Sequence, residues 1–214
     1  MDVLITDVSP DQVALATKRS QGTNNVTTKI VDVVDLSGFE DNTFDVITVC
    51  YGYMFCEDKQ RAFNESYRVL KPGGTLIATY WKKLPMIEFS QSVLKAIYQD
   101  GIIPAPSINP MALSEDGLAN TYIAKAGFSA SHVSNQTSSY PFDLGTDKDL
   151  VYKLGVLSIY PKLQELKERG EEAALQRGKE AFWEKMESAS NVTIDAEGRH
   201  VVNDNIFEMI VAKK

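Results

Sequence analysis

The stretch VLITDVSPDQVALATKR, residues 3–19, decides the fold of this chain. Its short apolar run ends in Asp7, and the residues after it are typical of a helix start. Ser9 is a favoured N-cap, the proline that follows suits the first helical turn, and Gln12 completes a capping box. The pattern predicts a strand over residues 3–7 that turns directly into a helix.

The same alternation of strand and helix continues along the chain. Residues 28–34 are rich in β-branched side chains, which favour a strand, and FDVITVC at 44–50 is an apolar run typical of a parallel strand buried on both faces. Asp58 is expected to cap a helix, and KPGG at 71–74 is expected to end that helix in a turn. TLIATYW at 75–81 predicts the next strand. Alternating strands and helices with short connections predict an α/β fold around a mostly parallel sheet.

The second half of the chain has longer helical patterns and fewer strands. Its apolar spacing predicts a helix over 86–100, a helix from Ser114 to Gly127, strands over 128–142 and 205–212, a charged helical segment over 147–190, and a loop that contains Pro104, Pro106 and Pro110. The chain shows no internal repeat and no low-complexity linker. We therefore expect one domain over residues 1–214, with a helical insertion or lid at 147–190. The Glu- and Lys-rich stretch 164–187 within it is interpreted as a solvated helix face, with part of a lid over the substrate as the alternative.

Composition and charge exclude several classes of function. The net charge is -7, with 29 acidic and 22 basic residues among 214, which argues against a nucleic-acid or anionic-membrane surface. No apolar run is long enough for a membrane span, and no signal peptide is visible, so a cytoplasmic location is expected. Cys50, Cys56, His132 and His200 do not have the spacing of a metal site, so no metal is expected. His200 is interpreted as a surface turn residue more readily than as a base.

Two acidic residues stand where predicted strands end. Asp7 follows the first strand, and Asp32 lies at the end of the second. Ligands of open parallel sheets bind outside the carboxyl ends of the strands. One carboxylate there is suited to accept hydrogen bonds from ribose hydroxyls and the other from an adenine amino group. The alternative is that each aspartate is only a helix cap or a turn former.

The ordered motifs carry a resemblance to a known family. DVSPDQVALATKR at 7–19, VDVVDLSGFEDNTFDVITVCYGYMF at 31–55 and RVLKPGGTLIATYW at 68–81 resemble successive motifs of class I S-adenosylmethionine-dependent methyltransferases. The nearest group is similar to the ubiquinone/menaquinone-biosynthesis methyltransferases. The resemblance implies a Rossmann-like sheet with strand order 3-2-1-4-5-7-6, an antiparallel last strand, and S-adenosyl-L-methionine as the cofactor across the strand ends.

The resemblance also implies a set of cofactor-binding residues. Asp7 matches the acid that binds the ribose, and Asp32 matches the acid near the adenine amino group, although Asp35 could be aligned in its place. The remaining matched residues are Val8 and Gln12 beside the adenosine, Val33 with the amide beside Asp32, and Cys50 and Tyr51 at the strand end that passes the methionyl part. No catalytic residue is assigned.

One motif of the family is absent from this sequence. The family's first motif, an acid followed by a glycine-rich turn, would stand upstream of Met1, on a central strand of the sheet. The expectation is therefore that the chain is a fragment of a longer enzyme whose sheet is incomplete. Such a chain is expected to be poorly soluble or partly unfolded, and to bind the cofactor weakly or not at all.

The functional hypothesis is methyl transfer to a small-molecule acceptor, whose accepting atom could be carbon, oxygen or nitrogen. A DNA-base methyltransferase is less favoured, because no NPPY-like or Pro-Cys motif is present. A non-catalytic methyltransferase-like partner is the alternative, and a nicotinamide-dependent oxidoreductase ranks below it. Four aromatic residues, Tyr51, Tyr53, Phe55 and Trp81, are either substrate-pocket or core residues. The sequence does not indicate an oligomeric state.

Overall fold

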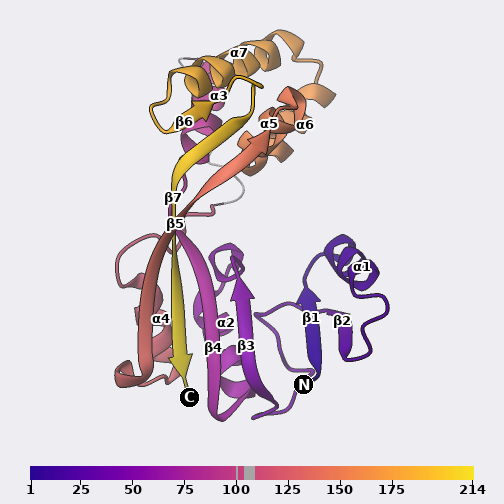
Figure 1. Cartoon of the computed structure of the whole chain (residues 1–214), viewed down its shortest axis with the longest axis vertical. Coiled ribbons are helices and arrows are strands. Elements are labelled where there is room, and N and C mark those ends of the chain that lie inside the picture. Colours follow the sequence, from indigo (N-terminus) through magenta and orange to yellow (C-terminus); the bar gives the residue numbers. More distant parts are fainter. Residues whose placement is uncertain (100, 104–108) are drawn as a thin grey trace. The chain divides into compact units, whose positions relative to one another are not determined.

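The computed structural model describes residues 1–99, 101–103 and 109–214 of the chain (Figure 1). It is an α/β protein that divides into two compact units. One unit comprises Met1–Ala78, Gly117–Asn135 and Ile210–Lys214, and the other comprises Thr79–Asp116 and Gln136–Met209. Residue 100, Pro104 and Pro106 of the expected helix end and loop lie outside the described residues.

The first unit begins with the predicted strand–helix pair. Strand β1 (Val3–Asp7) leads into helix α1 (Pro10–Arg19), and the Ser9 Oγ accepts a hydrogen bond from the Gln12 amide at 3.4 Å. Strand β2 (Val26–Ile30) pairs with β1 in parallel. It begins and ends earlier than the expected 28–34, so Asp32 lies in the loop after the strand.

The remainder of this unit contains strand β3 (Phe44–Cys50), a 3₁₀ turn at Tyr53–Phe55, helix α2 (Lys59–Val69), the first part of strand β4 (Leu70–Lys83) and helix α4 (Leu118–Ala126). The predicted cap of α2 is confirmed, because the Asp58 Oδ1 accepts from the Arg61 amide at 2.9 Å. The prediction of a turn at KPGG, residues 71–74, is wrong, because these residues already belong to β4. Gly73 has a φ of 78° there, and a Cβ on Gly74 would come within 3.0 Å of the Asp45 carbonyl oxygen.

The strands form two separate sheets. One contains β1 and β2, and the other has the order β3-β4-β7-β5, with β6 (Val192–Ile194) beside β7 (His200–Lys213). Strand β5 spans Val133–Gly145, later than the expected 128–142, and β7 starts before the expected 205–212. Figure 1 shows β7 running opposite to β3, so the sheet is mixed. In the order 3-2-1-4-5-7-6, β2 and β1 correspond to strands 3 and 2, and β3, β4, β7 and β5 correspond to strands 4, 5, 7 and 6. A strand at position 1, between these two groups, stays a prediction.

The expected burial of FDVITVC on both faces is wrong. Strand β3 contains no buried residue, and Val46 is 50% exposed. The cause is that β3 is an edge strand, paired with β4 alone among the described strands. The β1–α1–β2 segment shares this property, since Leu36 is the first buried residue of the chain.

The second unit packs helices around an aromatic core. Helix α3 (Met86–Tyr98) contacts α7 (Glu172–Ser188), and Phe182 of α7 meets the ring of Phe89 in an edge contact at 5.9 Å. Helices α5 (Lys148–Gly155) and α6 (Tyr160–Glu168) complete the helical segment expected at 147–190. The single domain over the whole chain stays a prediction, and so does the role of these helices as a lid.

Two further features concern membrane spans and the environment of His200. None of the described helices is long and apolar enough to cross a membrane. His200 is buried next to the Trp183 ring, 5.6 Å between centroids, so its interpretation as a surface turn residue is wrong. It occupies the first position of β7, which the sequence pattern did not include in the strand.

Candidate functional site

Asp7 lies at the carboxyl end of β1, where the strand gives way to helix α1. Its Oδ1 accepts a hydrogen bond from the Ser9 amide at 2.8 Å, which fixes the turn into the helix. The side chain is exposed, and within the described part of the chain no hydrogen bond to Oδ2 is found. Asp7 is therefore a turn former, as the alternative interpretation held, and its second oxygen remains accessible to a ligand.

Asp32 is brought close to Asp7 by the parallel pairing of β1 and β2. The pairing continues one step past the strand end, because the Val31 amide donates to the Asp7 carbonyl oxygen at 3.1 Å. Asp32 follows immediately, is exposed, and accepts from the Val34 amide through Oδ1 at 2.9 Å. The two carboxylates thus occupy neighbouring strand ends and form the same type of turn.

Asp35 occupies a third turn of this kind. Its Oδ1 accepts from the Ser37 amide at 3.1 Å, and hydrogen bonds from the Ser37 side chain and backbone hold the pKa of the Asp35 carboxyl below its usual value. Both Asp32 and Asp35 are exposed and both keep one turn bond. The choice between them as the adenine-side acid stays open.

A hollow of about 480 Å³ lies against β1 and α1. Asp7 and Gln12 line it together with apolar and polar residues of the strand and helix, and it extends past the end of α1 to Thr23 and to Val26 at the start of β2. Of the seven predicted cofactor residues only these two line the hollow; Val8, Asp32, Val33, Cys50 and Tyr51 do not.

The end of β3 carries Cys50 and Tyr51 in an unusual backbone turn. Tyr51 has a φ of 52°, in the left-handed region that bulky residues seldom adopt. Gly52 follows it, and a Cβ there would come within 2.8 Å of the Val49 Cγ1. Such constrained turns concentrate at functional sites. The turn suits the predicted role of this strand end as a backbone segment that a ligand approaches closely.

The remaining aromatic candidates divide between core and surface. Tyr53 is buried and donates a hydrogen bond to the Ser66 Oγ at 2.6 Å, and Trp81 is buried against Phe142. Phe55 is exposed. Tyr53 and Trp81 are therefore core residues, and burial raises the pKa of the Tyr53 hydroxyl.

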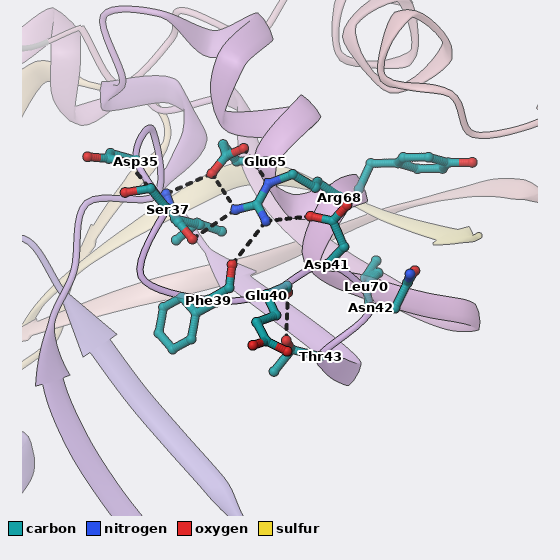
Figure 2. A network of polar contacts seen from close by, with 12 residues as sticks. Asp35, Ser37, Phe39, Glu40, Asp41, Asn42, Thr43, Glu65, Arg68 and Leu70 are labelled. Atoms are coloured by element: carbon teal, nitrogen blue, oxygen red, sulfur yellow. Dashed lines mark hydrogen bonds and ion pairs between the residues drawn. The ribbon is translucent and has the colours of Figure 1, made fainter.

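Arg68 and Glu65 on α2 were not predicted from the sequence. Figure 2 shows the Arg68 guanidinium at the centre of a polar network that reaches the loop carrying Asp32 and Asp35. The sequence did contain a signal for this pair. Glu65 and Arg68 are three residues apart, which puts both on one helix face, just before the KPGG segment.

Part of the chain is similar in sequence to known methyltransferases. Residues 1–78 match the model of a methyltransferase domain. The matched residues run from β1 into β4. The chain is 39% identical over 88 residues to a ubiquinone/menaquinone biosynthesis C-methyltransferase of Enterobacter sp., which covers 41% of this chain and 33% of that protein. It is 42% identical over 66 residues to the enzyme of the same description from Ruegeria sp., covering 31% of this chain and 26% of the relative.

Solved structures share the fold of this chain. The YcgJ protein of Bacillus subtilis aligns with a TM-score of 0.60 at 16% identity, covering 100% of this chain and 82% of that one. A methyltransferase of Bacillus halodurans aligns with a TM-score of 0.55 at 17% identity, covering 100% and 83%. The chain therefore resembles class I S-adenosylmethionine-dependent methyltransferases in fold and in the motifs of residues 1–78. It spans about a third or less of the length of the curated relatives that it matches.

Proposed function

We propose that this chain takes part in S-adenosyl-L-methionine-dependent methyl transfer to a small-molecule acceptor. The observation that carries the proposal is the link between the Val31 amide and the Asp7 carbonyl oxygen, which sets the exposed carboxylates of Asp7 and Asp32 at adjacent strand ends. A nucleoside offers two ribose hydroxyls and one adenine amino group, and two neighbouring carboxylates complement these donors.

The residues of the chain fit this ligand in type and in exposure. Asp7 keeps one oxygen for a ribose hydroxyl while the other holds the turn with Ser9. Gln12 lines the hollow beside it. The cofactor supplies the methyl group on a sulfonium centre, and the protein's contribution in such a reaction is mainly to position the acceptor and to exclude water. No general base is assigned among the described residues.

A non-catalytic role is the second candidate, and one observation favours it. The β1–α1–β2 segment has no buried residue, and β1 pairs with β2 alone among the described strands. A methyltransferase-like chain with an open sheet edge is suited to associate with another polypeptide through that edge. In that case the chain binds the nucleoside or a partner without turning over an acceptor.

Two features concern the methyl acceptor. The curated relatives carry the description of C-methyltransferases, which supports a carbon acceptor over oxygen or nitrogen. We place the control of the acceptor in the segment from α5 to α7, which carries exposed apolar residues such as Leu150 on α5 and Leu157 in the 3₁₀ turn after it. A cytoplasmic location is retained as a prediction.

Two assays separate these functions. Titration of the labelled chain with S-adenosylhomocysteine, followed by NMR, tests whether the nucleoside binds at residues 7–9 and 32–34. Incubation with methyl-labelled S-adenosylmethionine and a panel of small phenolic, enolic and amine acceptors tests turnover. Binding without labelled product for any acceptor favours the non-catalytic role, and no binding overturns the proposed function.

A further inference from the structure

The loop between β2 and β3, residues 31–43, has no regular secondary structure. It carries both acids that could face the adenine, Asp32 and Asp35. A loop of this kind loses much conformational entropy when it is fixed, and its backbone polar groups need partners. The question is which side chains hold it in place.

Arg68, in the last turn of helix α2, binds the loop at three points. Its Nη2 donates to the Leu36 carbonyl oxygen at 2.8 Å, and its Nη1 donates to the Phe39 carbonyl oxygen at 3.0 Å (Figure 2). The Nη1 also donates to the Asp41 carboxylate at 2.7 Å. The planar guanidinium has five donors in a fixed fork, so it can satisfy several acceptors at once.

Glu65 fixes the orientation of Arg68 from the preceding turn of the same helix. Its two carboxylate oxygens accept from Arg68 Nε and Nη2, each at 2.8 Å. One of them, Oε2, also accepts from the Leu36 amide at 2.9 Å. The amide and the carbonyl of Leu36 are therefore both held by one Glu–Arg pair, and the Leu36 side chain is 8% exposed.

Leu36 is directly connected to the turn that Asp32 forms. The Asp35 amide donates to the Asp32 carbonyl oxygen at 2.9 Å, and the Val34 amide donates to the Asp32 Oδ1 at 2.9 Å. These bonds make residues 32–35 a closed turn, whose next residue is the anchored Leu36. A fixed Leu36 therefore restrains where the Asp32 carboxylate lies.

We propose that Arg68, oriented by Glu65, is a positioning residue that holds the loop of Asp32 in place for recognition of the adenine amino group. The cofactor part of this inference rests on the proposed function. The loop part does not, because it concerns hydrogen bonds within the chain. The signal in the sequence is a Glu and an Arg three residues apart at the end of the helix before KPGG.

The test compares Arg68→Met and Arg68→Lys with Arg61→Met as a matched control. Arg61 lies on the same helix, is exposed, and also acts through its charge on Asp35, yet no hydrogen bond joins its side chain to residues 31–43 in the described part of the chain. Each Arg→Met variant removes one positive charge. Arg68→Lys keeps the charge and loses the fork.

The ligand readout is the ratio of two dissociation constants. S-Adenosylhomocysteine carries the adenine amino group, and S-inosylhomocysteine replaces it with an oxo group. The native chain and Arg61→Met should prefer the adenosyl ligand by roughly tenfold, the factor for one hydrogen bond to a charged group. In Arg68→Met and Arg68→Lys this ratio should fall towards one. Loosened structure alone would weaken both ligands equally, and an unchanged ratio in Arg68→Met overturns the positioning role.

The loop readout needs no ligand. Hydrogen exchange of the Leu36 amide should be slow in the native chain and in Arg61→Met, and faster in Arg68→Met. Equal protection in all three overturns the claim that Arg68 holds the loop. If the native chain does not bind S-adenosylhomocysteine, the proposed function and the adenine part of the inference both fail, while the exchange experiment still decides the loop part.

Discussion

Replacement of Asp7 by asparagine separates the two roles that the structure gives this residue. The Oδ1 holds the Ser9 amide at 2.8 Å, and an amide oxygen in the same place keeps that bond. The second position becomes an NH₂ group, which cannot accept from a ribose hydroxyl. Asp7→Asn should therefore leave the turn into α1 intact and remove ligand bonds alone, whereas Asp7→Ala removes both.

The expected magnitudes follow from these bonds. Loss of hydrogen bonds between a charged carboxylate and hydroxyls costs about 1–3 kcal/mol of binding free energy, which is roughly a 5-fold to 150-fold rise in the dissociation constant. Loss of the single turn bond to Ser9 costs about 0.5–1.5 kcal/mol of unfolding free energy. Asp7→Asn should show the first effect alone and Asp7→Ala should show both.

The assay combines ligand titration with urea unfolding for the native chain and both variants. Asp11→Asn is the control, because Asp11 lies on the first turn of α1 and does not line the hollow. It should change neither the dissociation constant of S-adenosylhomocysteine nor the unfolding midpoint by more than a small amount. An Asp7→Asn variant that binds as tightly as the native chain would refute the assignment of the ribose to Asp7.

Three further predictions concern stability. Tyr53→Phe should lower the unfolding free energy by about 1 kcal/mol in urea, because it removes the buried bond to the Ser66 Oγ; an unchanged midpoint would show that this bond contributes nothing net. Gly155→Ala should lower it by about 1–3 kcal/mol, because the added Cβ would collide with the buried Phe182 ring; a neutral effect would mean that the ring moves freely. The hydrogen bond from Arg68 holds the pKa of the Glu65 carboxyl below its usual 4.5. The ionised Glu65 therefore stabilises the fold fully above about pH 4.5, and this stabilisation is lost as the pH falls through the lowered pKa. Glu65→Gln should therefore reduce the difference between the urea midpoints at pH 7 and pH 3, and an equal difference in variant and native chain would contradict this.

Local signals predicted much of the first unit from the sequence. The N-cap at Ser9 and the cap at Asp58 each appear as expected, since both depend on residues that are close along the chain. The expected capping box is only half formed, because the Ser9 amide donates to Asp7 and not to the Gln12 side chain. The strand bounds of FDVITVC were also predicted, because β-branched and apolar residues favour an extended backbone.

Features that depend on distant partners could not be predicted in the same way. The exposure of β3 follows from its place at a sheet edge, which no local pattern reports. KPGG became part of a strand because Gly73 and Gly74 pair with the distant Lys214, whose amide donates to the Gly74 carbonyl at 2.9 Å. The burial of His200 likewise depends on Trp183 and on a strand that starts earlier than its pattern indicates.

The candidate site shows the same division. The position of Asp7 at a strand end was predictable from the sequence motifs, and the parallel pairing of β1 and β2 followed from the α/β pattern. Asp32 was expected at the end of its strand and lies in the loop just after β2. Arg68 was not predicted as a site residue, because its partners in the loop, the Leu36 and Phe39 carbonyl oxygens and the Asp41 carboxylate, lie far earlier in the chain. The two backbone carbonyls have no residue type that a sequence pattern could report, and the spacing of Glu65 and Arg68 indicates only their contact within the helix.

The central claim is that the ends of β1 and β2 bind the adenosine of the cofactor. It is tested most directly by NMR titration of the uniformly ¹⁵N-labelled chain with S-adenosylhomocysteine, which detects weak binding as well as tight binding. The account predicts saturable shifts of the amides around Asp7 and Asp32, which disappear in Asp7→Asn. Shifts confined to other residues, or none at millimolar ligand, would contradict it.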